Sequence, residues 1–184
     1  MKMSGDSSEF TVKLAMASVF AALVYVATTI FMLNIPTTTG YFNFGETIIY
    51  LGAFLFGPFV GAFAGGIGAS VADALSPYAV FAPGTLAIKS IEGALVGLLN
   101  MKILKWTGKQ SVAAIVSILI GGAEMVSGYF LYEAFALSYG VGTALVEVPF
   151  NIVQMIVGLA VAVPVFQVIL RVFPQLRNQN VVMP

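Results

Sequence analysis

The sequence predicts an all-α integral membrane protein with six transmembrane helices and both termini on the cytoplasmic side. Of its 184 residues, 59% are hydrophobic and 9% are charged, whereas a soluble domain carries about 25% charged residues. Apolar stretches of about 17–25 residues recur, which is the length of a membrane-spanning helix and not of a porin strand. The distribution of lysine and arginine then sets the number of helices and their orientation.

Seven of the eight basic residues fall on one side of a six-helix arrangement. They precede or begin the first helix, surround the turn between the fourth and fifth helices, or follow the sixth: Lys2, Lys13, Lys102, Lys105, Lys109, Arg171 and Arg177. Loops rich in lysine and arginine stay in the cytoplasm, so this side is predicted to be cytoplasmic. An odd number of helices would divide the basic residues between the two sides.

The helices are expected at residues 12–33, 45–56, 59–75, 83–104, 111–135 and 144–173. The first follows a polar, acidic segment that does not resemble a cleaved signal peptide. The second is short for a full crossing, and Gly57 and Pro58 end it. The third carries a stripe of small residues at every fourth position, including Gly61 and Gly65 and ending at Asp73, which allows neighbouring helices to approach closely.

Pro83 suits the first turn of the fourth helix, and a polar turn around Gly108 precedes the fifth. Pro164 predicts a kink in the sixth. The external loops are expected at residues 34–44, 76–82 and 136–143. The whole forms one membrane domain over residues 12–173, with cytoplasmic tails at 1–11 and 174–184.

The absence of cysteine and histidine excludes several classes of chemistry. Disulfides, cysteine nucleophiles, Ser–His triads and ordinary zinc, haem or iron–sulfur ligation all require one of these residues. No metal or cofactor is therefore expected. The formal net charge is zero, so bulk electrostatics gives no reason to expect a nucleic-acid partner.

Charged residues inside membrane helices are costly and are usually functional. Six carboxylates and one lysine are expected in the outer half of the protein: Glu46, Asp73, Lys89, Glu92, Glu124, Glu133 and Glu147. Buried charges need partners or water. We therefore expect a hydrated cavity that opens outward, lined by the last three helices and covered by the loop at 34–43. The candidate ligand contacts are Asn43, Glu46, Lys89, Glu92, Glu124, Tyr132, Glu147 and Asn151.

Structural roles are the alternative for several of these residues. Lys89 and Glu92, three positions apart on one helix face, can neutralise each other. Glu46 can interact with the dipole of its helix, and Glu133 can cap the outer end of the fifth helix. Asp73 can bind amides of the loop that follows it.

Four segments together resemble the substrate-binding S component of an energy-coupling factor (ECF) transporter, a class of vitamin importer. They are GYFNFGETIIYLGAFLFGPFVGAFAGGIGASVADALS, YAVFAPGTLAIKSIEG, GAEMVSGYFLYEAF and EVPFNIVQMIVG, and they span most of residues 40–158. The first helix also carries the small-residue motif A-x-x-x-A at Ala17 and Ala21, with Ser18 and Ala22 alongside.

The resemblance implies six helices and a ligand held between the outer parts of the last three, under the first external loop. It implies a transmembrane coupling subunit, which docks on Ala17 and Ala21, and two ATPase subunits in the membrane of a prokaryotic cell. The chain itself has no G-x-x-x-x-G-K-[ST] phosphate loop with which to hydrolyse ATP. Within the family, the pattern is similar to transporters of riboflavin, of the hydroxymethylpyrimidine precursor of thiamine, and of cobalamin precursors.

The many acids favour a ligand with amine or ring N–H donors over an anion, which supports an aminopyrimidine. Two other functions remain open at this point. One is a proton-coupled carrier that acts alone, with Glu124 or Glu147 as proton relay. The other is a membrane hydrolase with paired carboxylates, although the H-E-x-x-H, G-x-S-x-G and D-x-x-D signatures are absent.

Overall fold

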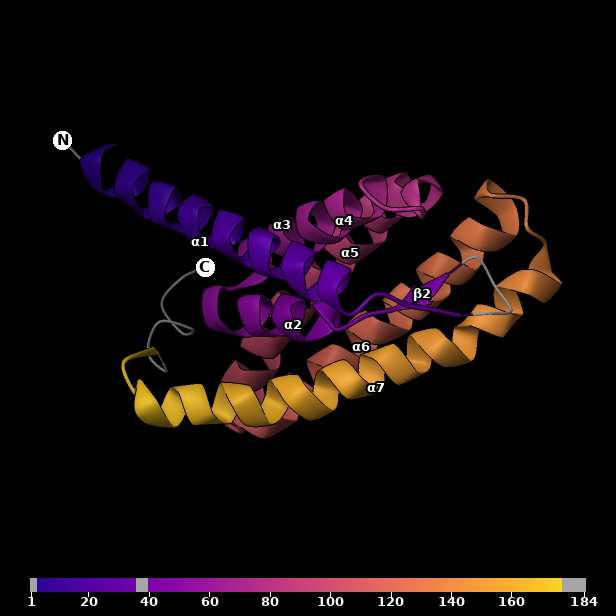
Figure 1. The fold of residues 1–184 in the computed structure, drawn as a ribbon. Coiled ribbons are helices and arrows are strands. Elements are labelled where there is room, and N and C mark those ends of the chain that lie inside the picture. Colours follow the sequence, from indigo (N-terminus) through magenta and orange to yellow (C-terminus); the bar gives the residue numbers. More distant parts are fainter. Residues whose placement is uncertain (1–2, 36–39, 177–184) are drawn as a thin grey trace.

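Six helical segments run back and forth between two ends of the molecule (Figure 1). The computed structural model describes residues 3–35 and 40–176. Its α-helices are α1 (Met3–Ile30), α2 (Gly45–Phe56), α3 (Pro58–Phe63), α4 (Ser70–Ala74), α5 (Ala82–Thr107), α6 (Gln110–Leu131) and α7 (Val141–Val172). Two π-helices, η1 (Ala64–Ala69) and η3 (Tyr132–Ala136), a 3₁₀-helix η2 (Ala79–Phe81) and the strands β1 (Leu33–Asn34) and β2 (Tyr41–Phe42) complete the described elements.

The predicted all-α membrane fold is confirmed, with local differences. The third predicted helix is continuous in direction, but η1 separates α3 from α4. The loop expected at 34–43 contains a short antiparallel pair, in which Leu33 lies opposite Phe42 and Asn34 opposite Tyr41. The first helix begins at Met3, within the expected tail. Residues 1–2, 36–39 and 177–184, which include Lys2 and Arg177, lie outside the described residues.

Within the described residues, four helical segments are long and apolar enough to cross a membrane: Glu9–Ile30, Ala79–Thr107, Gln110–Ala136 and Val141–Val172. The 12-residue α2 is apolar but short. At 1.5 Å per residue it is about 18 Å long, whereas the hydrocarbon core is about 30 Å thick. Six complete crossings and cytoplasmic termini therefore stay predictions.

Helix α2 lies at the centre of the bundle, where α1, α3, α5 and α7 pack around it. Nearly all of its residues are buried. Tyr50 and Phe54 are fully enclosed, and the Phe54 ring lies 4.9 Å from that of Phe166 in α7. The longer helices shield α2 from lipid, so its short length leaves little of it exposed.

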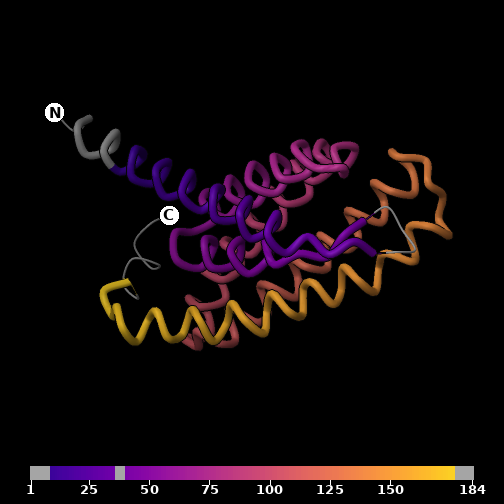
Figure 2. The backbone as a smooth tube through the Cα atoms, viewed as in Figure 1, coloured from indigo at the N-terminus to yellow at the C-terminus, as the bar shows by residue number. Residues whose placement is uncertain are grey.

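The two ends of the bundle differ in charge. The start of α1 and the end of α7 lie toward the left in Figures 1 and 2, and the β1–β2 hairpin and the α6–α7 connection lie toward the right. Lys105 and Lys109 flank Gly108, which ends α5 with φ 67°. Trp106, the one tryptophan of the chain, is 88% exposed there. A tryptophan beside lysines is typical of a membrane–water interface.

The glycine-rich η1 packs directly against α1. A methyl group added at Gly68 would come within 2.5 Å of the Ala21 carbonyl oxygen and 2.7 Å of Val24 Cβ. Contacts this close to backbone leave no room for a side chain. The small-residue stripe of the sequence therefore allows η1 and α1 to approach each other.

We expect Gly68→Ala to lower the unfolding free energy by about 1–3 kcal/mol, because the added methyl group overpacks the η1–α1 contact. Thermal unfolding of the purified protein in detergent measures this change. Gly142→Ala in α7 is the matched control, since an added methyl group there meets no atom within 4 Å. Equal stability of the two variants would contradict the close packing described here.

Candidate functional site

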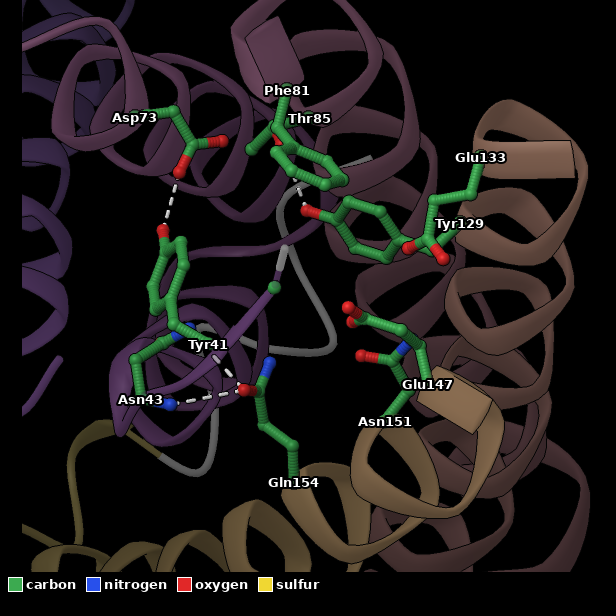
Figure 3. A pocket seen from close by; sticks show the side chains of 11 residues that line it. Tyr41, Asn43, Asp73, Phe81, Thr85, Tyr129, Glu133, Glu147, Asn151 and Gln154 are labelled. Carbon is green, nitrogen blue, oxygen red and sulfur yellow. Dashed lines mark hydrogen bonds between the residues drawn. The ribbon is translucent and has the colours of Figure 1, made fainter. Parts of the chain in front are cut away.

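A pocket lies at the hairpin end of the bundle, between β2, α4, α5, α6 and α7 (Figure 3). It holds about 360 Å³ of space, including its open mouth, which is within the range of small-molecule sites. Its lining combines carboxylates, amides and aromatic rings: Gly40, Tyr41, Asn43, Asp73, Phe81, Thr85, Tyr129, Glu133, Glu147, Asn151 and Gln154.

The segment around β2 forms one side of the pocket. A tyrosine of this strand connects it to α4 through a hydrogen bond. The Tyr41 hydroxyl donates a hydrogen bond to Asp73 Oδ1, and its ring lies 4.5 Å from that of Tyr78. Burial, together with the Asp73 carboxylate, raises the pKa of the Tyr41 phenol well above its usual range. Tyr41 therefore stays protonated and keeps its role as donor.

Directly after β2, the side chain of Asn43 connects the segment to Gln154 on α7. Asn43 donates to Gln154 Oε1 from its backbone N at 3.0 Å and from Nδ2 at 3.2 Å. Asn43 Oδ1 accepts from the backbone N–H of Gly45 at 2.8 Å, which satisfies a donor in the first turn of α2. The short hairpin is thus held by side chains from two helices.

A buried ion cluster lies behind the pocket wall. Lys89 on α5 is 3% exposed and pairs with Glu46 on α2 and with Glu92, whose Oε2 lies 3.0 Å from Nζ. The Tyr50 hydroxyl donates to Glu92 Oε1 at 2.9 Å. Opposite charges packed this closely offset part of the cost of removing them from water.

Gln154 connects this cluster to the pocket. Its Nε2 donates to Glu46 Oε1 at 2.8 Å, while its Oε1 accepts from Asn43. Because a carboxylate only accepts hydrogen bonds, Glu46 fixes which end of the Gln154 amide faces the hairpin.

Two further carboxylates extend into the pocket from opposite elements. Glu133 belongs to η3, and Glu147 lies one turn before Asn151 on α7 (Figure 3). A π-helical turn changes the direction of the side chains relative to a regular α-helix. On the opposite wall, the hydroxyls of Thr85 and Tyr129 lie 3.0 Å apart and join α5 to α6.

The predicted ligand contacts divide into three groups. Asn43, Glu147 and Asn151 line the pocket. Glu46, Lys89 and Glu92 form the ion cluster behind it. The structural alternative paired Lys89 with Glu92 but did not include Glu46. Glu124 and Tyr132 lie outside the lining; the Tyr132 hydroxyl donates to the Val80 carbonyl oxygen at 3.0 Å.

The pocket also contains residues beyond the predicted set. They are Gly40, Tyr41, Asp73, Phe81, Thr85, Tyr129, Glu133 and Gln154. Gln154 could have been included from the sequence, because it continues the helical stripe of Glu147 and Asn151. Glu133 was expected to cap its helix, but its side chain faces the pocket (Figure 3).

The predicted docking residues on α1 are buried within the chain. Ala17 is fully enclosed and Ala21 is 7% exposed, on the face that packs against η1. Ser18 and Ala22, on the neighbouring row, are exposed.

Comparison with known proteins gives a consistent result. The sequence model of the family "ECF-type riboflavin transporter, S component" matches residues 9–171. A thiamine precursor transporter, HmpT, of Lactococcus lactis is 32% identical over 151 residues, which cover 82% of each chain. An uncharacterised protein of Pyrococcus woesei is 39% identical over 75% of this chain and 88% of its own length.

A solved structure, the S component of a bacterial ECF transporter, has a similar fold. It superposes with a TM-score of 0.66 at 21% identity and covers 88% of this chain and 96% of its own.

We expect Lys89→Met to lower the unfolding free energy by about 3–5 kcal/mol, because Glu46 and Glu92 would remain as buried charges without a counter-ion. Thermal unfolding in detergent measures this change, and Lys105→Met, at an exposed lysine of the same helix, is the control. Adding Glu46→Gln and Glu92→Gln should restore most of the stability. If the triple variant is no more stable than Lys89→Met, charge pairing is not the reason for the loss.

Proposed function

Because the chain belongs to the family of ECF-type riboflavin transporter S components, we propose that it is the substrate-binding component of an ATP-driven importer for a water-soluble vitamin or vitamin precursor. The members of this family are transport proteins and not enzymes. The membrane hydrolase is therefore ruled out.

The pocket at the hairpin end is the observation that carries this proposal. It combines a concave shape with convergent carboxylates, amides and phenols, which is typical of a site for a small polar molecule. Asn43, Glu147 and Asn151 are the predicted contacts that reach it. A heterocycle such as hydroxymethylpyrimidine, riboflavin or a cobalamin precursor is a suitable ligand.

The orientation follows from the charge at the two ends. Lys102 and Lys105 lie near the end of α5, Lys109 lies just before α6, and Arg171 is in the last turn of α7, whereas α5 and α7 contribute residues near their starts to the pocket. By the positive-inside rule the end with these basic residues faces the cytoplasm. The pocket then opens to the outside of a prokaryotic cell membrane, where a nutrient is captured, and the chain termini lie inside.

Import driven by ATP requires partners, since the chain has no phosphate loop of its own. We assign this role to a transmembrane coupling subunit and two ATPase subunits. The coupling subunit would contact the exposed row of α1 that includes Ser18 and Ala22. Ala17 and Ala21 support this surface from behind, through their contacts with the rest of the chain.

We expect the purified wild-type chain to retain about one heterocyclic molecule per protein, detected by native mass spectrometry and identified after extraction. Asn151→Ala should reduce retention and lower the affinity for the extracted compound about tenfold, because one polar contact of the pocket is lost. Gln167→Ala, on the same helix but distant from the pocket lining, is the control. Uptake by liposomes that contain the chain alone would instead indicate the proton-coupled carrier.

We expect Ala22→Leu to reduce co-purification with the coupling subunit while thermal stability stays unchanged, because the added atoms cover an exposed docking surface. Ala21→Leu, one residue earlier, should instead lower the melting temperature, since its side chain is enclosed. Normal assembly of a folded Ala22→Leu protein would contradict the placement of the docking surface.

A further inference from the structure

A positively charged surface lies where α5 ends, α6 begins and α7 ends. We call it the basic surface; it comprises four cations and the tryptophan, all exposed: Lys102, Lys105, Trp106, Lys109 and Arg171. The sequence contains no aspartate or glutamate at residues 93–123 or 148–184. Among the residues that the structure describes, none of the four cations forms an ion pair. Their charge is therefore available to an anion from outside the chain.

A hydrogen bond holds the end of α7 against the start of α6. Gln167 Nε2 donates to Ser111 Oγ at 3.0 Å. Arg171 follows Gln167 by four residues and so lies on the same face of α7, while Lys109 precedes Ser111 by two residues. Since α6 and α7 run in opposite directions (Figure 1), Arg171 and Lys109 lie at a similar level. The basic surface therefore extends from the α5–α6 turn to α7.

Exposed apolar side chains border the basic surface on all three helices. An exposed apolar residue lies within four positions of a basic one, toward the middle of each helix: Leu98 on α5, Val112 on α6 and Val168 on α7. Exposed apolar side chains of a membrane protein contact the acyl chains of lipids, and cations beside them reach the headgroups. The basic surface therefore lies at headgroup depth, where its anion belongs to a lipid.

The lysine at the start of α1 is arranged differently. Lys13 Nζ lies 2.9 Å from Glu9 Oε1, one helical turn earlier. The charge of this lysine is offset locally, whereas the cations of the basic surface have no such partner. A lysine at another helix terminus thus provides a reference for the effect of removing one positive charge.

We propose that the basic surface binds the headgroups of anionic phospholipids. Lys105, Lys109 and Arg171 attract the negative headgroup, and the indole N–H of Trp106 donates to its oxygens. The bound lipid also bridges the ends of α5, α6 and α7, so it stabilises the bundle. This inference goes beyond the proposed function and does not depend on which molecule the pocket holds.

Native mass spectrometry tests the preference with two lipids of identical acyl chains, phosphatidylglycerol and phosphatidylcholine, supplied in equal amounts in detergent. The wild-type chain should retain at least about tenfold more phosphatidylglycerol, because several cations act together. Lys105→Gln, Lys109→Gln and Arg171→Gln should each lower this ratio about two- to fivefold, and the triple variant should bring it close to one. Lys13→Gln, which also removes one positive charge, should leave the ratio unchanged.

The melting temperature in mixed micelles provides a second measurement and shows whether each variant is folded. Phosphatidylglycerol should raise the melting temperature of the wild type more than phosphatidylcholine does, since a ligand that binds only the folded state stabilises it. In the triple variant the two lipids should have equal effects. Without added lipid, the triple variant should melt at or above the temperature of the wild type, because repulsion between neighbouring cations is removed.

Three results would overturn the proposal. The first is equal retention of the two lipids by the wild type. The second is an equal loss of preference in Lys13→Gln and in the single variants of the basic surface, which would assign the effect to net charge. The third is a wild type without lipid preference whose triple variant fails to co-purify with the coupling subunit, which would make this surface a contact for an acidic protein.

Discussion

The pairing of one buried lysine with two glutamates is the interaction on which the centre of this protein depends. Lys89 joins α5 to α2 through Glu46, and Gln154 extends the connection to α7. Three helices therefore meet at one polar point within an apolar bundle, where a misplaced charge has no access to water. Gln154 also binds Asn43, so the same point sets the position of the hairpin that borders the pocket.

The acids of the outer half divide according to their partners. Glu46 and Glu92 are neutralised within the bundle, and Asp73 accepts the Tyr41 hydroxyl that attaches the hairpin. Glu133 and Glu147 remain without a described counter-ion. A composition rich in intramembrane carboxylates thus serves two purposes. Three of these six groups hold the helices and the hairpin in place, and Glu133 and Glu147 line the pocket.

The order and type of the helices could be predicted from the sequence, because apolar length and the basic residues are local signals. The site was only partly predictable. The partner of Lys89 across the bundle, Glu46, lies 43 positions away in the chain, and no spacing rule connects the two. Regular helical geometry could not give the direction of Glu133, since η3 is π-helical. Small residues at Ala17 and Ala21 indicated close packing, but they did not show which surface packs against them.

The single tryptophan has a consequence for how this protein can be observed. Trp106 is exposed near the end of α5, and Thr85 lines the pocket near its start. At 1.5 Å per residue the two lie roughly 30 Å apart along the helix. Intrinsic fluorescence excited at the indole absorption band therefore reports the polarity around the basic end and is insensitive to direct contact between ligand and protein. The emission of this one residue would record events at the membrane surface or at a partner, separately from occupancy of the pocket.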